Sequence, residues 1–231
     1  MQPIDPNAPQ IYGANNVMLM TNAIPLTKID SIKEYMKRFM NAEEGVTASP
    51  EPPSEGGRKS DARSCQVAWI QPDTKFTGEF INGVTNVIIS MNRDWFGFDT
   101  HVPEPIQYTM YKYDENNKIK DHYDWHMDSW YSTRPQPLER KLSMSIQLSH
   151  SDEYTGCNLI FPDSERITDS TEVYGGNLFN GQPVTKQEWD DIAKAKGTAV
   201  FFPSSFYHRV TPIESGERHA LVNWLQGPKW R

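Results

Sequence analysis

The sequence predicts a mainly β fold, a jelly-roll sandwich with helices packed against its outside. Two stretches with helical periodicity come first, and short β-prone runs separated by turn residues follow from Ile106 onward. Aromatic residues make up 12% of the 231 residues, which supplies enough large apolar side chains for a sizeable core. We expect one domain over residues 1–231, with helical support over about 17–95 and the jelly-roll core over about 106–231.

Two amphipathic helices are expected in the N-terminal half of the chain. The first follows a cap at Thr27 and runs to about residue 40, and the second covers about 76–92. Their apolar stripes are Ile29, Ile32, Met36 and Phe39 in the first helix and Phe80, Val84, Val87 and Met91 in the second. Both helices are expected to brace a sheet.

The β-prone runs are expected to form that sheet and its partner. They cover residues 65–70, 108–113, 119–125, 141–149, 159–161, 198–202, 207–211 and 218–225. Residues 47–64 are rich in Pro, Gly, Ser and charge, which predicts a mobile loop, either a lid or a plain surface linker. Residues 163–197 form an insertion with a short helix, where Thr185 and Glu188 match a capping box and Gly197 marks the exit.

Composition narrows the class of protein. The net charge of −7 repels polyphosphate, so a nucleic-acid partner is not expected. Cys65 and Cys157 are too few for a disulfide framework, which favours a reducing cytoplasm. No run approaches the roughly 18 apolar residues of a membrane span. Residues 1–16 are polar and loose, lack the order of a secretory signal, and are expected to remain on the mature protein.

The pattern His126-Met127-Asp128, followed far downstream by His208, is the strongest chemical signal. In an extended strand the first and third residues point to the same side, so His126 and Asp128 can bind one ion. His208 would complete a set of two imidazoles and one carboxylate, the usual ligands of non-haem Fe(II) oxygenases. Three protein ligands leave coordination positions for a bidentate cosubstrate and for O2.

Arg218 supplies a candidate anchor for a dicarboxylate cosubstrate such as 2-oxoglutarate. Residues 214–217 are expected to form a turn, so that His208 and Arg218 face one cavity from adjacent strands of a hairpin. Arg218 shares its strand face with Ala220 and Val222, where a buried cation would need an anion. A surface ion pair with Glu214 or Glu217 is the alternative.

Three other residues near the motif each have alternative roles. Tyr111 and Tyr113 share one face of the strand that leads to the motif, and either is a candidate donor to the cosubstrate or a core residue. His122 lies four residues before His126, the spacing of helical zinc sites, but the surrounding composition favours a strand. A surface or supporting role is therefore expected for His122.

Two segments around these residues carry a family pattern. The first is Gln107-Tyr108-Thr109-Met110-Tyr111 followed by Tyr123-Asp124-Trp125-His126-Met127-Asp128; the second is Phe202-Pro203-Ser204-Ser205 through His208-Arg209-Val210-Thr211-Pro212, then Gly216 and Arg218. With Leu142-Ser143-Met144-Ser145 and Tyr154-x-Gly156 between them, they resemble the prolyl 4-hydroxylase-like Fe(II)/2-oxoglutarate dioxygenases, particularly the bacterial and phage hydroxylases of the PKHD type. Many relatives have Gly-Gly-Glu-Leu where this chain has Gly156-Cys157-Asn158-Leu159.

The resemblance implies a cupin-like double-stranded β-helix, iron at His126, Asp128 and His208, 2-oxoglutarate at Arg218 with help from a tyrosine, and ascorbate as reductant. The expected activity is hydroxylation of a prolyl residue of a peptide or protein, with 2-oxoglutarate and O2 converted to succinate and CO2. Hydroxylation of a free amino acid or another small molecule, dealkylation of nucleic acid and a non-catalytic metal-binding jelly roll are the alternatives.

Overall fold

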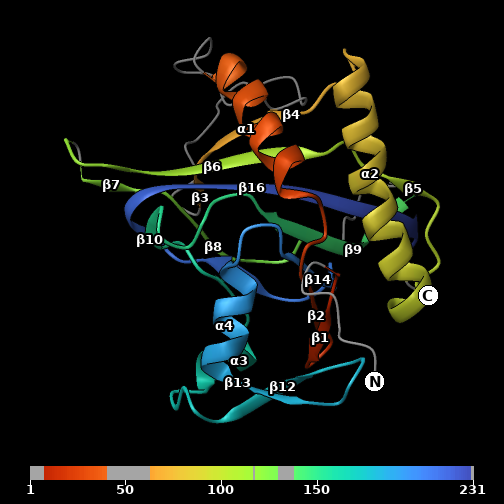
Figure 1. Ribbon diagram of the computed structural model, residues 1–231, viewed down its shortest axis with the longest axis vertical. Helices are drawn as coiled ribbons and strands as arrows, with labels where there is room; N and C mark the ends of the chain where they lie inside the picture. Colours follow the sequence, from red (N-terminus) through yellow and green to blue (C-terminus); the bar gives the residue numbers. More distant parts are fainter. Residues whose placement is uncertain (1–7, 41–62, 117, 130–137, 230–231) are drawn as a thin grey trace.

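The computed structural model describes residues 8–40, 63–116, 118–129 and 138–229. Two antiparallel sheets form a jelly roll with helices outside it, as the sequence predicts (Figure 1). Along the larger sheet the strands run β13 (Pro183–Thr185), β12 (Val173–Asn177), β1 (Ile11–Ala14), β2 (Val17–Met20), β14 (Ala199–Pro203), β9 (Leu138–Gln147), β16 (Ile213–Pro228), β6 (Gln107–Asp114) and β4 (Gln66–Trp69). The smaller sheet runs β11 (Leu159–Ile160), β15 (His208–Val210), β8 (His122–His126) and β3 (Arg63–Ser64).

Three short strands pair with the larger sheet off this path. β5 (Val102–Pro103) and β10 (Tyr154–Gly156) pair with β16, and β7 (Ile119–Lys120) pairs with β6. The predicted strand over 119–125 is therefore two strands, β7 and β8, in different sheets. Gly216 of β16 pairs with Tyr154 of β10 and has a positive φ of 74°. A Cβ added at Gly216 would lie 2.0 Å from the carbonyl oxygen of Glu153. Only glycine fits there.

Strand alternation gives the larger sheet two different faces. On β9, Leu142, Met144 and Ile146 belong to the main hydrophobic core, while Ser145 and Gln147 line cavities on the opposite face. β16 follows the same rule, because Leu221 and Leu225 pack in the core whereas Arg218, Ala220 and Val222 line the interior between the sheets. The interior face carries the functional residues described below.

The helices α1 (Leu26–Met40) and α2 (Lys75–Met91) cover the outer face of the larger sheet (Figure 1). Their buried residues join the core of β6, β9, β14 and β16: Ile29, Ile32 and Met36 from α1, and Phe80, Val84, Ile88 and Met91 from α2. Among the predicted stripe residues whose side chains are described, all but Val87 lie in this core, and Val87 packs against it partly buried. α1 begins one residue before Thr27, so the proposed cap lies inside the helix. α2 ends at Met91 and continues as a short π-helix, Asn92–Phe96.

The N-terminal segment and the insertion form one extension of the larger sheet. β1 and β2 make a hairpin, and β1 pairs with β12 of the insertion. The prediction of a loose start up to residue 16 is therefore wrong for residues 11–14. The insertion also holds α3 (Pro162–Arg166) and α4 (Lys186–Lys194), and α4 begins with the predicted capping box of Thr185 and Glu188.

One sequence prediction lies mostly outside the described residues, and another is wrong. The loop predicted over 47–64 lies outside the description except for its last two residues, which form β3. The predicted hairpin is wrong: His208 lies on β15 in the smaller sheet and Arg218 on β16 in the larger one. The chain passes between the sheets at residues 211–212, and residues 213–217 already belong to β16.

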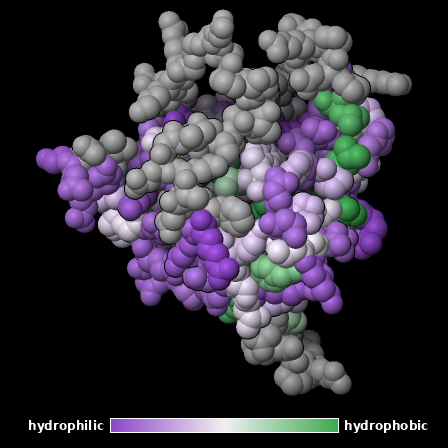
Figure 2. Space-filling view, turned by 90° about the horizontal axis from the view of Figure 1, so that it is seen from above, coloured by the Kyte–Doolittle hydropathy of each residue, from purple (hydrophilic) through white to green (hydrophobic). Residues whose placement is uncertain are grey.

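On the side seen from above, the described residues that are visible show hydrophobic side chains as separate spots among more hydrophilic ones (Figure 2). No helix among the described residues is both long and apolar enough to cross a membrane.

Candidate metal site and the cavity beside it

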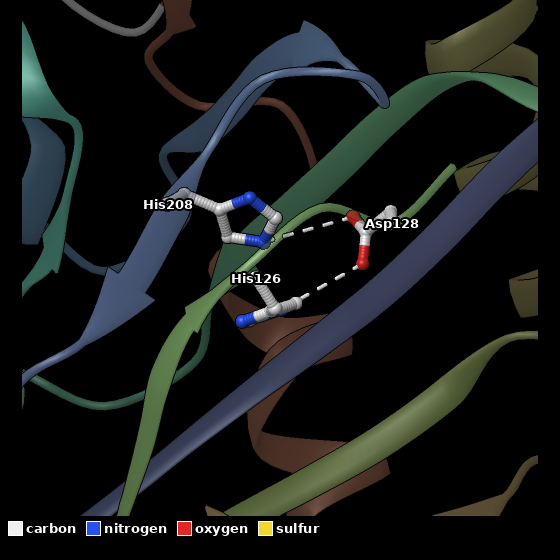
Figure 3. A group of neighbouring side chains, drawn as sticks. All are labelled: His126, Asp128 and His208. Atoms are coloured by element: carbon white, nitrogen blue, oxygen red, sulfur yellow. Dashed lines mark ion pairs between the residues drawn. The ribbon is translucent and has the colours of Figure 1, made fainter. Parts of the chain in front are cut away.

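His126, Asp128 and His208 point toward one another at the rim of the smaller sheet (Figure 3). His126 ends β8, His208 begins β15, and the two pair directly in register. Asp128 follows in a bend just past β8, and its carboxylate oxygens lie 3.8 Å from His126 Nε2 and 3.7 Å from His208 Nε2. The candidate ligand atoms all lie within 4.8 Å of one another, close enough to share one ion.

Both imidazoles are oriented by backbone carbonyls. His126 Nδ1 lies 2.7 Å from the oxygen of Asp124, and His208 Nδ1 lies 3.0 Å from the oxygen of Phe206. A carbonyl oxygen only accepts, so each Nδ1 carries a proton and each ring turns its Nε2 toward Asp128. With Nε2 as the free nitrogen of each ring, two lone pairs and a carboxylate face each other and repel unless a cation lies between them. The donor set therefore fits a metal ion.

A bulge in β8 shapes this corner. Between Tyr123 and His126, β8 spans three steps where β15 spans two, from His208 to Val210. The additional residue brings Tyr123 and His126 to the same face, where their rings stack with centroids 3.5 Å apart. His122, which a regular strand would place on the face of His126, instead directs its Nδ1 to the oxygen of Lys120 and does not line the cavity.

Asp128 is held by Ser143, which in turn contacts Ser204. Ser143 on β9 donates to Asp128 Oδ2 at 2.7 Å and lies 2.8 Å from the hydroxyl of Ser204. Burial raises the pKa of Asp128, but the neighbouring His208 and the hydrogen bond from Ser143 outweigh it and hold the pKa below its usual value. Burial, followed by the neighbouring His208, lowers the pKa of His126 to about 4. At neutral pH the carboxylate is ionised and His126 is neutral, the forms that bind a metal.

A cavity of about 50 Å³ extends from the three side chains into the space between the sheets. Its lining also includes Tyr111 from β6, Ser145 from β9, and Arg218, Ala220 and Val222 from β16. A second cavity of about 300 Å³, beneath α3 and α4, shares Ser145, Leu159 and Arg218 with the first. Arg218 thus borders both.

Arg218 is a buried cation surrounded by neutral groups. Its side chain is 4% exposed, and its Nε donates to Gln147 Oε1 at 3.1 Å. Burial lowers the pKa of Arg218, yet the neighbouring Cys157, Tyr154 and Tyr111 raise it overall, so the guanidinium stays charged. Those neighbours are themselves neutral at pH 7; burial raises the pKa of the Cys157 thiol to about 11. No acidic side chain pairs with Arg218 among the described residues.

The two predicted tyrosines have different surroundings. Tyr111 lines the metal cavity, and the guanidinium carbon of Arg218 lies 5.6 Å from its ring centroid. Tyr113 lines a separate surface hollow, together with Cys65 and Glu217. Sequence reasoning missed the supporting residues Ser143 and Gln147, although polar residues alternating with Leu142, Met144 and Ile146 mark an interior face. It also missed Arg63, which lines the metal cavity from a two-residue strand that has no periodicity to read.

Comparisons with known proteins agree with this geometry. The model of the 2OG-Fe(II) oxygenase superfamily matches residues 106–226. A PKHD-type hydroxylase of Psychrobacter sp. (strain PRwf-1) is 29% identical over 107 residues, covering 45% of this chain and 33% of that protein. One from Shewanella sp. (strain ANA-3) is 30% identical over 105 residues, covering 45% and 37%. The match thus spans about a third of the length of these curated relatives.

Solved structures share the fold at low sequence identity. The viral collagen prolyl hydroxylase of Paramecium bursaria chlorella virus-1, in its 2OG complex, superposes with a TM-score of 0.59 at 15% identity, covering 92% of this chain and 97% of that one. A Pseudomonas putida prolyl-4-hydroxylase gives 0.58 at 17%, covering 93% and 94%. A Trichoplax adhaerens prolyl hydroxylase, in complex with a hypoxia inducible factor peptide fragment, gives 0.58 at 14%, covering 91% and 83%. The fold is the double-stranded β-helix that the sequence resemblance implies.

Proposed function

Because this chain belongs to the 2OG-Fe(II) oxygenase superfamily, we propose that it is a 2-oxoglutarate-dependent dioxygenase that holds Fe(II) with His126, Asp128 and His208. The observation that carries the proposal is the convergence of these three ligands beside a buried arginine that lacks a described acidic partner. Two neutral imidazoles and one carboxylate suit Fe(II) and leave part of its coordination sphere open.

Arg218 is proposed to bind the distal carboxylate of 2-oxoglutarate. Its planar fork matches a carboxylate, and Gln147 orients the guanidinium through Nε. Tyr111, beside the guanidinium, is the better placed of the two tyrosines to assist. The anion would neutralise the buried charge, which supports this role.

The chain contributes positioning and electrostatics to the reaction. Fe(II), when bound with 2-oxoglutarate, supplies the oxidising chemistry: decarboxylation to succinate and CO2 gives two electrons to O2, and the hydroxylated substrate gives two. Ser143 fixes Asp128, and the carbonyls of Asp124 and Phe206 fix the two imidazoles. The three metal-binding side chains are therefore oriented before the metal or the cosubstrate binds. Phe202, Val210 and Val222 give the cavity apolar walls that limit water around the reacting groups.

We propose a prolyl residue of a peptide or protein as the substrate. The support is the likeness to PKHD-type hydroxylases and to prolyl hydroxylases, one of them solved with a peptide. A free amino acid or another small molecule is the alternative on the same core, and a non-catalytic metal-binding jelly roll is the alternative outside enzymes. The complete ligand set with Arg218 disfavours the last.

Two further features belong to this proposal. Ascorbate is the proposed reductant for iron that becomes oxidised without substrate turnover. The cytoplasm is the proposed location, because Cys65 and Cys157 are both free thiols, as expected in a reducing compartment.

The substrate class is tested by succinate release from the protein loaded with Fe(II), 2-oxoglutarate and ascorbate. Proline-rich peptides, free L-proline and methylated oligonucleotides are offered in turn, and mass spectrometry of the peptide looks for a gain of about 16 Da, one oxygen atom. Succinate formation coupled to peptide oxidation is expected. Turnover with the oligonucleotide alone would refute the prolyl assignment.

The site assignment is tested by two variants in the same assay. Asp128→Ala should abolish iron-dependent turnover while the circular dichroism spectrum is retained, because one metal ligand is removed. Arg218→Ala should mainly raise the 2-oxoglutarate concentration that half-saturates turnover. Full activity of either variant at low 2-oxoglutarate contradicts the assignment.

A further inference from the structure

A second arginine, Arg63, lines the metal cavity from β3, the edge strand of the smaller sheet. We propose that Arg63 is a substrate-binding residue and that it pairs with a carboxylate of the molecule to be hydroxylated. The inference rests on the proposed function and narrows it, since it selects substrates that carry an anionic group close to the reacting carbon.

The position of Arg63 follows from the pairing of β3 with β8. Arg63 lies opposite Tyr123 in register, and its guanidinium carbon is 4.6 Å from the centroid of the Tyr123 ring. That ring stacks on His126 with centroids 3.5 Å apart. The guanidinium therefore lies no farther from the His126 ring than these two distances added together. A group held by Arg63 would lie beside the metal ligands.

Arg63 has spare hydrogen-bonding capacity. Its Nε donates to Cys65 Sγ at 3.0 Å and one terminal nitrogen donates to Gln107 Oε1 at 3.2 Å. A guanidinium has five N–H groups, so these contacts leave donors for a ligand. Among the described residues no carboxylate forms an ion pair with Arg63, and its neighbours Cys65, Gln107 and Tyr123 are uncharged side chains at neutral pH.

The charges that line the cavity leave Arg63 unbalanced. Of the described lining residues, Arg63 and Arg218 are cations and Asp128 is the anion. The 2+ charge of Fe(II) and the 2− charge of 2-oxoglutarate cancel, and Arg218 and Asp128 cancel. One positive charge, that of Arg63, remains in a partly buried site, where it favours an anionic partner over a neutral one.

A carboxylate is the anion that fits a prolyl substrate. It has two sources: the α-carboxylate of free or C-terminal proline, and the side chain of an acidic residue next to an internal proline. Both present the same planar pair of oxygens to the guanidinium fork. The test below separates them.

The experiment measures equilibrium binding by the protein with Mn(II) in place of iron and saturating 2-oxoglutarate, so that no turnover occurs. The probes are matched pairs: L-proline and L-prolinamide, Gly-Gly-Pro and its amide, and acetyl-Glu-Pro-Gly-amide with its Gln counterpart. The wild-type protein should bind the carboxylate member of at least one pair about tenfold or more tightly than its neutral partner. The pair that discriminates identifies the source of the carboxylate.

Three variants assign the preference to Arg63. In Arg63→Gln the ratio of affinities within that pair should fall to about one, and in Arg63→Lys it should be intermediate, because charge remains but the fork is lost. Arg166→Gln removes an equal charge from an exposed arginine, 81% exposed in its side chain, and should keep the wild-type ratio. A supporting role of Arg63 against Tyr123 would weaken both members of a pair equally.

The outcomes are distinct from those that test the proposed function. An unchanged ratio in Arg63→Gln, or no carboxylate preference in the wild-type protein, overturns the role of Arg63. Mn(II) and 2-oxoglutarate should bind to Arg63→Gln as to wild type, which also shows that the variant is folded. Failure of the wild-type protein to bind Mn(II) or 2-oxoglutarate would instead refute the proposed function.

Discussion

Single hydrogen bonds hold the candidate ligands in place at the residue scale. Ser143 and Gln147 both point inward from β9, and each contacts one member of the site: Ser143 contacts Asp128 and Gln147 contacts Arg218. Such partners fix the direction of a ligand without touching the ion or the cosubstrate themselves. They are therefore the residues at which metal binding and cosubstrate binding can be separated.

Ser143→Ala should weaken Mn(II) binding by about 10- to 100-fold, because Asp128 loses the donor that orients it and a buried oxygen loses its partner. Mn(II) titration followed by electron paramagnetic resonance measures the dissociation constant. Ser215→Ala is the control, since Ser215 is exposed and its hydroxyl contacts that of Thr155 and no metal ligand. Equal affinities in the two variants would show that Ser143 does not support the metal site.

Gln147→Glu should raise the half-saturating 2-oxoglutarate concentration by about tenfold or more. The new carboxylate would pair with Arg218 and compete with the cosubstrate for the buried cation. Mn(II) affinity should remain near that of the wild type, because Gln147 does not contact the metal ligands. Gln182→Glu introduces the same charge at an exposed position and should behave as wild type; a similar rise there would point to a long-range charge effect.

At the scale of elements, pairings that bring distant strands together fix the site. The match of β8 with β15 sets the two imidazoles side by side, and the bulge in β8 turns Tyr123 to the same face. Near Arg218, β10 pairs with β16 at Gly216, where the backbones approach too closely for a side chain. Backbone geometry at these two pairings therefore determines where the functional side chains lie.

Gly216→Ala should destabilise the protein by at least about 2 kcal/mol, because it combines a left-handed backbone conformation with a clash against the Glu153 carbonyl. Urea unfolding measures the free energy. Gly83→Ala is the matched control: Gly83 lies in α2 with nothing within 4 Å of an added Cβ, so alanine should stabilise the helix by about 0.5–1 kcal/mol. Equal effects of the two substitutions would contradict the close approach of β10 to β16 at Gly216.

Sequence patterns predicted elements better than they predicted connections. The stripes of α1 and α2 and the capping box of α4 depend on local spacing, so they could be read directly. The hairpin between His208 and Arg218 could not, since turn residues do not reveal that the chain changes sheets there. β1 was missed because it is short and follows a polar, proline-containing segment. Its partner, β12, lies in a distant insertion.

The candidate site was likewise predicted only in part, because residue types can be read from the sequence but the pairing of distant strands cannot. His126, Asp128, His208 and Arg218 were recognisable as residue types that share one chemistry, and the structure brings them to one cavity. Tyr111 and Tyr113 are equivalent in a strand pattern, and only the cavity lining distinguishes them. Arg63 depends on a cross-strand pairing with Tyr123 that no local pattern encodes.

For the whole molecule, the two sheets perform different tasks. The smaller sheet carries the two histidines, while the larger sheet supplies Ser143, Gln147 and Arg218 from its interior face. The helices on the outer face of the larger sheet fix β9 and β16 through the main core. Metal and cosubstrate are thus expected to bind between the sheets, each held mainly by one of them.

The most direct test of this account is an anaerobic titration of the protein with Fe(II) and 2-oxoglutarate, followed by visible absorption. The account predicts a weak charge-transfer absorption that requires both components, saturates at one iron per chain and is absent in Asp128→Ala. Absence of that absorption from the wild-type protein at saturating Fe(II) and 2-oxoglutarate, or an identical absorption in Asp128→Ala, would contradict it.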